Sequence, residues 1–329
     1  MRRCTTDSCL MTASARQFSL DAPVATILPN PRQDWSRIAS GHGRVRVARE
    51  LQVDWSDFTP ESYLFTHCTI VSSVATQKNG YYIDPACAEL VNNNGNAWTN
   101  EVLMSTFRSF VGGENYLEHV QIPELSKGKI LDAVLRPVVY KNEKGQEASV
   151  YYCDILVATN RKHSGLVKDI ESGKLTTMSM GCLADYVTCS RCGKVLTDNQ
   201  PNCTHLDREL LTSFTDEDGV ERIVAELCGR MIEEDGKLVG DPESVKFIEA
   251  SWVEKPAFQG AVLNHYLSDV PETAKILEFP TSKLAETVED LFKLRVADRT
   301  GMIVLRVARE ELLRRQREEM ITRVARGVM

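Results

Sequence analysis

Four cysteine and histidine residues in a short stretch of the chain restrict its fold more than any other sequence feature. Cys189 and Cys192 form a Cys-x-x-Cys pair, and after ten residues Cys203 and His205 form a Cys-x-His pair. Thiolate and imidazole groups at this spacing suit tetrahedral Zn²⁺. Because all four positions are filled by protein ligands, the sequence predicts a structural zinc site in a loop insertion over residues 186–208, not a catalytic metal.

Two other interpretations of these cysteines stay open. A redox Cys-x-x-Cys is disfavoured because no helix follows it directly to lower a thiol pKa, and thiols that bind nothing are the second alternative. The 329-residue chain has ten cysteines, and its N-terminal segment lacks the continuous apolar stretch of a secretory signal. We therefore expect free thiols and metal ligands, not a disulfide framework.

Composition argues against two classes of protein. The formal charge is −7, so no overall positive field favours nucleic-acid binding, and no run of eighteen apolar residues predicts a membrane span. A zinc-ribbon nucleic-acid binder would need a basic metal loop. Positive and negative residues instead balance there: Arg191, Lys194 and Arg208 against Asp198, Asp207 and Glu209.

The chain divides into four predicted segments. Residues 1–60 have scattered arginines and prolines without a sustained period, which is typical of a flexible or processed arm. Residues 61–265 mix strand and helix patterns and predict a β-rich α+β domain. A linker is expected over 266–284. Residues 285–329 have a helical pattern with seven arginines after position 305, either a solvated face or a docking segment for an acidic partner.

One serine of the predicted domain is a candidate nucleophile. Ser179 lies in a Met-Ser-Met-Gly stretch and would need a nearby base, since a serine hydroxyl is a poor nucleophile at neutral pH. Among six histidines, His119 follows a Gly-Gly pair and precedes a strand, a position that exposes an imidazole. Asp154 lies within an apolar strand and either faces solvent or needs a buried partner. Cys153 and Cys182 are interpreted as core residues.

Three segments that carry these residues resemble, in the same order, the prohead (capsid maturation) proteases of tailed bacteriophages. They are "NYLEHVQIPELSKGKILDAVL", "VYYCDILVATNRKHSGLVKDIESGKLTTMSMG" and "FIEASWVEKPAFQGA". The similarity is to the T4-like branch, which shares its fold with the herpesvirus assemblins, and it covers about Tyr63 to Val262. It implies a barrel flanked by helices, in which Ser179 is the nucleophile and His119 the base. Asp154 would orient His119. In the assemblin arrangement a second histidine does so, and His163 would then compete for that role.

The resemblance also implies a function. The expected activity is a serine endopeptidase that cleaves scaffold and major capsid proteins, and itself, during head assembly in the host cytoplasm inside the prohead or virion. No cofactor is needed for such catalysis, a homo-oligomer is compatible with it, and neither a membrane nor a nucleic acid is an expected partner. The alternative is a non-enzymatic virion component that keeps the protease fold and the structural zinc.

Overall fold

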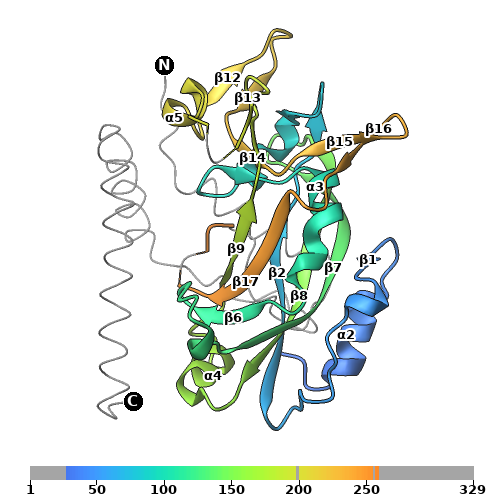
Figure 1. Ribbon diagram of the computed structural model, residues 1–329, viewed down its shortest axis with the longest axis vertical. Coiled ribbons are helices and arrows are strands. Elements are labelled where there is room, and N and C mark those ends of the chain that lie inside the picture. Colours follow the sequence, from blue (N-terminus) through green and yellow to red (C-terminus); the bar gives the residue numbers. More distant parts are fainter. Residues whose placement is uncertain (1–26, 198–199, 255, 259–329) are drawn as a thin grey trace. The chain divides into compact units, whose positions relative to one another are not determined.

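The computed structural model describes residues 27–197, 200–254 and 256–258, and its largest element is a seven-stranded sheet (Figure 1). The strands follow the order β2-β8-β7-β6-β17-β9, and β1 pairs with β7 beside this path. The β6–β17 ladder is parallel and the others are antiparallel. The strands are β1 (Val45–Arg46), β2 (Tyr63–Ser72), β6 (Glu114–Leu117), β7 (Gly128–Lys141), β8 (Glu147–Asn160), β9 (Met178–Ala184) and β17 (Val245–Trp252).

Both faces of the central strands are buried. In β8, Ile155 and Val157 point into the main apolar core, whereas Leu156 and Ala158 point into a second apolar cluster on the opposite face. Side chains alternate between the faces of a strand, so a strand covered on both sides is apolar throughout. This explains why β8 has a continuous apolar run in the sequence.

The sheet curls without closing into the barrel that the resemblance implies. Its two end strands, β2 and β9, contact each other. No ladder joins them in the part of the chain that the structure describes. The fold is therefore mixed α+β with a β-rich core built on an open, curled sheet.

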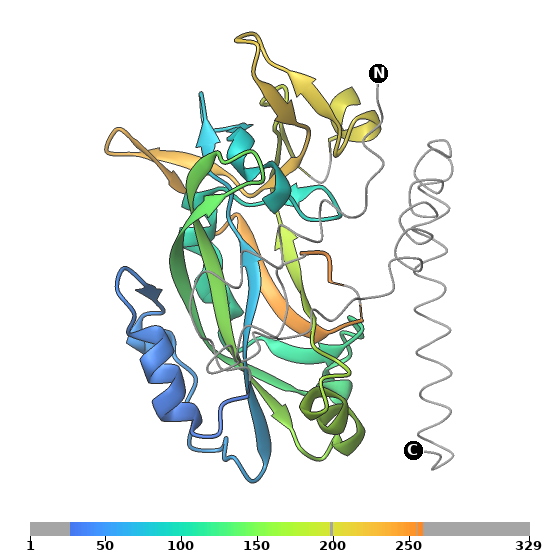
Figure 2. The same cartoon turned by 180° about the vertical axis from the view of Figure 1, so that it is seen from behind.

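Residues 27–60 pack on the domain, which corrects the prediction of a flexible arm for this part of residues 1–60. Helix α2 (Pro31–Ala39) covers one face of the sheet (Figures 1 and 2) and buries Trp35. The Trp35 Nε1 donates a hydrogen bond to Asp132 Oδ2 at 2.7 Å. A few apolar residues are enough to hold this segment on the domain, because the strands expose an apolar face that these residues cover. The composition of the segment alone does not reveal that face.

A second, four-stranded sheet holds the predicted metal loop. Its order is β11-β10-β14-β5, and it continues to Cys228, well beyond the predicted insertion 186–208. The strands of this sheet are β5 (Asn96–Ala97), β10 (Val187–Cys189), β11 (Val195–Leu196) and β14 (Glu226–Cys228). The other described strands form three hairpins, which are β3 (Thr76–Gln77)–β4 (Tyr82–Ile83), β12 (Ser213–Thr215)–β13 (Glu221–Ile223) and β15 (Met231–Glu234)–β16 (Lys237–Gly240).

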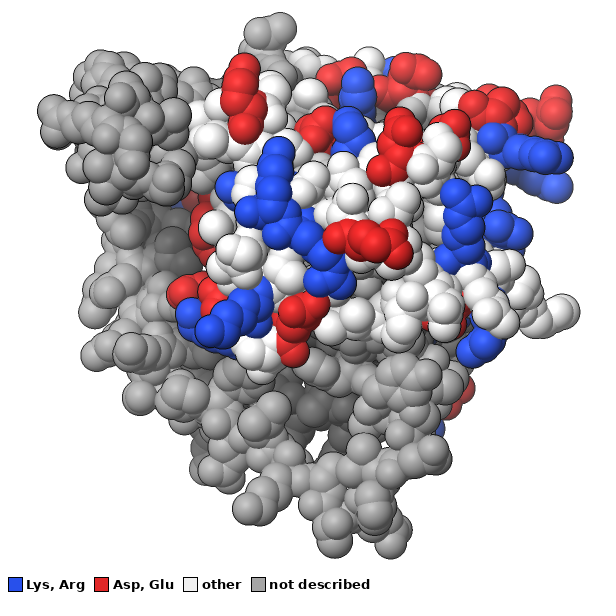
Figure 3. Space-filling view, turned by 90° about the horizontal axis from the view of Figure 1, so that it is seen from below, with Lys and Arg blue, Asp and Glu red and all other residues white. Residues whose placement is uncertain are grey.

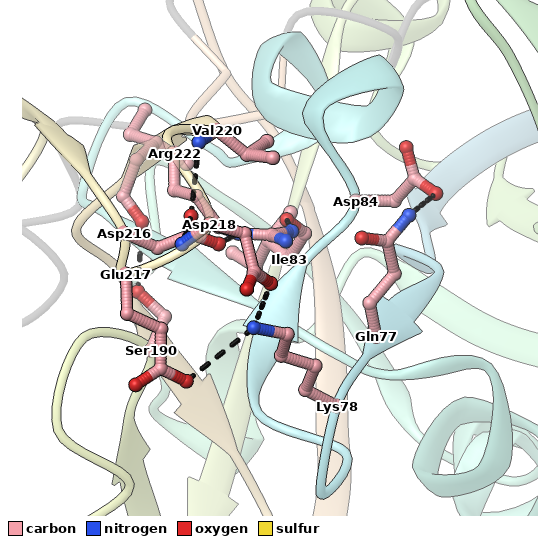
Figure 4. A network of polar contacts seen from close by, with 11 residues as sticks. Gln77, Lys78, Ile83, Asp84, Ser190, Asp216, Glu217, Asp218, Val220 and Arg222 are labelled. Carbon is pink, nitrogen blue, oxygen red and sulfur yellow. Dashed lines mark hydrogen bonds and ion pairs between the residues drawn. The ribbon is translucent and has the colours of Figure 1, made fainter.

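The β12–β13 hairpin is fastened to the β3–β4 hairpin by a polar network (Figure 4). Arg222 is 3 % exposed and donates to Asp216 Oδ2 at 2.7 Å and to the Ile83 carbonyl at 2.9 Å. Lys78 forms ion pairs with Asp218 and Glu217 of the connecting turn. A buried arginine with a carboxylate and a carbonyl as partners fixes this contact more firmly than exposed ion pairs do.

The remaining helices are short. They are α3 (Asn100–Thr106), α4 (Ser164–Glu171) and α5 (Thr204–Arg208), and the 3₁₀ segments η1 (Arg49–Leu51), η2 (Pro85–Leu90), η3 (Phe107–Phe110) and η4 (Pro123–Leu125). Within the described ranges, none of the helices has the length and apolar content needed to cross a bilayer. Residues 1–26, the predicted linker 266–284 and the predicted helical segment 285–329 lie outside the described residues.

Candidate active site and metal cluster

Ser179 is the second residue of β9 and lies on the face opposite the main apolar core. Its neighbour Met178 is buried in that core, and neighbouring side chains of a strand point to opposite faces. The cross-strand partner of Ser179 is Ser251 in β17, and paired residues project from the same face. Glu249 precedes Ser251 by two positions and shares this face. The sheet therefore gathers two serines and a carboxylate on one surface of β9 and β17.

His119 reaches this face from a strained turn after β6. Glu118 and His119 both have positive φ angles, 49° and 56°, a conformation that costs about 1–2 kcal/mol for each non-glycine residue. The Glu118 amide still donates to the Trp252 carbonyl at 2.9 Å, so the turn stays attached to β17. The result is a contact of 2.8 Å between His119 Nδ1 and Glu249 Oε1. Consecutive strained residues of this kind are concentrated at functional sites.

The Glu249 carboxylate is almost completely buried, and both of its oxygens accept hydrogen bonds. Its side chain is 1 % exposed. Oε1 accepts from His119 Nδ1 and, at 3.3 Å, from Gln121 Nε2, and Oε2 accepts from Ser251 Oγ at 2.6 Å. Because a carboxylate only accepts, this contact needs a proton on Nδ1, and in the neutral imidazole Nε2 then has a free lone pair. This is the tautomer that a general base needs.

Gly181 provides the space for this carboxylate. It pairs with Glu249 across the ladder. A Cβ atom at position 181 would lie 2.6 Å from Glu249 Oε1 and 2.9 Å from Gln121 Nε2. A residue with a side chain at position 181 would displace the Glu249 carboxylate, which contacts His119. The site therefore needs a glycine two positions after Ser179.

Asp154 is not the partner of His119, which corrects the predicted Ser-His-Asp arrangement. Its Oδ1 accepts from Thr69 Oγ1 at 2.7 Å, and its Oδ2 lies 3.0 Å from Arg136 Nε and 3.4 Å from Arg44 Nη1. Asp154 is on β8, and β7 and β6 stand between β8 and β17 in the sheet. Three strand spacings amount to about 14 Å. The carboxylate therefore lies too far along the sheet to orient the imidazole.

Asp154 instead forms a buried charge cluster. Burial alone would raise its pKa, but the guanidinium of Arg136 holds the pKa of Asp154 far below its usual range. His67 Nε2 lies 3.6 Å from Asp154 Oδ1, and burial lowers the pKa of this histidine, so its ring is neutral at neutral pH. Since Arg44 precedes β1, the cluster fastens the N-terminal segment to the sheet.

His163, the alternative orienting residue, lies at another place. It is the residue that precedes α4, and burial together with Lys127 and Lys162 lowers its pKa. Its surroundings are thus cationic, whereas the surroundings of His119 contain a carboxylate. The structure therefore supports an acid, and not a second histidine, as the partner of His119.

Sequence reasoning missed Glu249, Gln121 and Ser251. Glu249 carries the same signal that singled out Asp154, an acid inside an apolar strand, in the segment "FIEASW". That signal predicts a buried acid with a partner but does not identify the partner. Only strand order decides that Glu249 lies beside His119.

The four predicted metal ligands come together. The Sγ atoms of Cys189, Cys192 and Cys203 and a ring nitrogen of His205 all lie within 4.8 Å of one another. Ligand atoms around tetrahedral zinc are about 3.5–4 Å apart, given bond lengths of about 2.0–2.3 Å. Small side-chain movements would therefore complete the coordination, and the cluster can hold a metal ion.

Backbone amides prepare two of the thiols for a metal. The amides of Cys192 and Arg191 donate to the Cys189 sulfur, and those of Leu206 and His205 donate to the Cys203 sulfur. Burial raises the pKa of Cys189 to about 12 despite its amides. Burial also opposes ionisation of Cys203, but there the amides and neighbouring thiols lower the pKa. Two turns that each direct amides at a sulfur are typical of metal knuckles, because metal-bound thiolates accept such bonds.

The metal cluster does not border the candidate nucleophile. Ser179 is at the start of β9, whereas the cluster includes His205 of α5, which lies beyond the other end of β9 (Figure 1). The sequence places the metal loop directly after the serine strand, but the length of that strand separates them. The cluster therefore supports the fold of the second sheet and not the site around Ser179.

Charged side chains of both signs interleave on the face that carries α4 (Figure 3). Two ion pairs there are Arg161–Glu171 at 3.0 Å and Lys174–Asp169 at 3.1 Å. Among the described residues, this face has no continuous basic patch of the kind that binds nucleic-acid phosphates.

Comparisons with protein-family models, with curated proteins and with solved structures find no match to this chain.

Proposed function

We propose that the chain is a serine endopeptidase with Ser179 as nucleophile, His119 as general base and Glu249 as the acid that orients the base. The observation that carries this proposal is the 2.8 Å contact between His119 Nδ1 and buried Glu249 Oε1, on the face that also bears Ser179. A serine, an imidazole of the correct tautomer and a buried carboxylate are the parts that acyl transfer requires.

The chemistry follows from these parts. Nε2 of His119 takes the proton of the Ser179 hydroxyl while Oγ attacks the peptide carbonyl. The imidazolium then gives that proton to the leaving amine as the C–N bond breaks. Water, activated by the same nitrogen, hydrolyses the acyl-enzyme. Glu249 keeps Nδ1–H in place and stabilises the positive charge that forms on the ring twice in each cycle.

The biological setting that we propose is the maturation of a virus head. The support for it is the order of three motifs that resemble prohead proteases, with His119 in the first, Ser179 in the second and Glu249 in the third. Scaffold and major capsid proteins would be the substrates, and the chain itself a further one. We also propose that the α+β core is related to the protease fold of this family, with its sheet open where the resemblance implies a closed barrel.

A fluorophosphonate probe tests the catalytic proposal directly, because an activated serine displaces its fluoride and becomes phosphonylated. We expect one adduct on Ser179 in the full chain, found by peptide mass spectrometry, and no adduct in His119→Ala. Lack of labelling in folded wild-type protein would favour the non-enzymatic virion component instead.

We further propose that the metal cluster binds one structural Zn²⁺. The support is the ligand set, three thiols and an imidazole within 4.8 Å of one another. Soft ligands of this kind select zinc over calcium or magnesium. With no position left for water, the ion would supply folding energy and no chemistry to the reaction.

Removal of the metal is expected to destabilise the protein without inhibiting the chemistry of the remaining folded fraction. Structural zinc contributes on the order of 10 kcal/mol to small zinc domains. We therefore expect Cys189→Ser to lower the melting temperature by more than about 10 °C and to abolish the one-to-one zinc content measured by elemental analysis. Cys182→Ser, a cysteine outside the cluster, is the matched control and should retain the metal. Freshly purified, reduced protein without zinc would contradict the proposal.

A further inference from the structure

A ring of buried hydrogen bonds lies behind the candidate site, on the inner face of the strands that form it. Trp252 Nε1 donates to Thr159 Oγ1 at 3.2 Å, Thr159 Oγ1 donates to Asn115 Oδ1 at 3.2 Å, and Asn115 Nδ2 donates to the Ala250 carbonyl at 2.8 Å. Trp252, Thr159 and Asn115 are each 0 % exposed. The ring leaves β17 at residue 252, crosses β8 and β6, and returns to β17 at residue 250.

Donor and acceptor roles fix the direction of every bond in this ring. An indole N–H only donates and a carbonyl only accepts, so the threonine hydroxyl must receive the first bond and pass its own proton to Asn115. The amide group of Asn115 then has only one orientation, with its nitrogen on the Ala250 carbonyl. A buried chain in which each group has its partner is rigid, and removal of one member leaves others unsatisfied.

The two ends of the ring flank Ser251, which contacts both the strand of the candidate nucleophile and the buried carboxylate. Ser251 stands between Ala250 and Trp252, pairs with Ser179 and donates to Glu249. On the other side, Asn115 pairs with Ala250 and lies four positions before His119 in the chain. The ring thus ties the strand that carries Glu249 to the strand that leads into the strained turn of His119.

We propose that Asn115 and Thr159 are positioning residues that hold His119 against Glu249 through this ring. The inference rests on the proposed serine protease function, in which this contact orients the base. Neither residue reaches the reacting atoms. Their effect comes from keeping β6 and β17 in register, so that the strained turn at Glu118 and His119 delivers the imidazole to the carboxylate.

The test compares Thr159→Val with Thr159→Ser in the full chain. Valine has nearly the shape of threonine but breaks two bonds of the ring, whereas serine keeps the hydroxyl. For Thr159→Val we expect kcat to fall about tenfold while KM stays within about twofold, since a misplaced base affects the chemical step and not substrate binding. Thr159→Ser should restore most of kcat. Equal turnover by Thr159→Val and wild type, with both proteins folded, would overturn the inference.

A second readout separates this inference from the proposed function. In wild type, the ring N–H of His119 that contacts Glu249 should give a slowly exchanging signal in ¹H–¹⁵N spectra, assigned by its loss in His119→Gln. The signal should broaden or vanish in Thr159→Val and persist in Thr159→Ser. If wild type shows the signal but cleaves nothing, the protease proposal fails and the positioning role is still decided by the two variants. A missing wild-type signal, or one unchanged in Thr159→Val, overturns the positioning role.

Discussion

Ser179→Ala is expected to lower kcat/KM for peptide hydrolysis by about 10⁴-fold or more, and His119→Ala by a similar factor. Without the hydroxyl no acyl-enzyme forms, and without the imidazole nothing removes its proton. Because the residues act as one unit, the double variant should be about as slow as either single variant. The measurement is hydrolysis of a fluorogenic peptide, chosen from fragments of a co-expressed scaffold protein that wild type cleaves.

Ser251 provides the matched control for the serine. It lies directly across the ladder from Ser179, but it is 0 % exposed and its hydroxyl already donates to Glu249 Oε2. Ser251→Ala should therefore retain activity, with a loss of about tenfold from one missing hydrogen bond to the carboxylate. If Ser251→Ala were inactive while Ser179→Ala cleaved normally, the nucleophile would be the wrong serine of the pair.

Local sequence features predict the metal cluster well because its ligands are close in the chain. Seventeen consecutive positions contain all four ligands, and the structure brings them within 4.8 Å of one another. The glycine after Cys192 and the two short pairs define the turns by themselves. Such a site depends on local backbone geometry and hardly on the order of distant strands.

The acid of the candidate site could not be predicted in the same way. Glu249 is 130 positions from His119 in the chain, and their contact exists only because β6 and β17 pair in parallel. Asp154 and Glu249 look alike in sequence, as acids in apolar strands. Periodicity shows that such an acid is buried, but the partner depends on which strands are neighbours. The same reason explains the packed N-terminal segment, whose few apolar residues cover a face formed by strands far along the chain.

Glu249→Gln and Asp154→Asn should separate the two buried acids by what each one changes. Glu249→Gln keeps the size of the side chain but removes the charge that holds Nδ1–H of His119. An amide can present its nitrogen to that position and favour the wrong tautomer, so we expect kcat to fall by about 10³–10⁴-fold with little change of KM. Unfolding by urea should change by less than about 2 kcal/mol, since in this orientation Ser251 can still donate to the amide oxygen.

Asp154→Asn should have the opposite profile, with a large loss of stability and nearly normal turnover of the folded protein. It leaves the buried Arg136 and the half-buried Arg44 beside a neutral group, and removal of one partner from a buried ion pair costs about 3–5 kcal/mol. The sign of the pH dependence follows from the depressed pKa of Asp154. Its stabilisation is fully present above the unfolded-state pKa of about 3.9 and is lost as the pH falls toward the folded-state pKa. The difference in unfolding free energy between wild type and Asp154→Asn should therefore be constant from pH 7 to about pH 5 and shrink below about pH 4. If Asp154→Asn were stable but inactive and Glu249→Gln fully active, the carboxylate at His119 would have no part in the reaction.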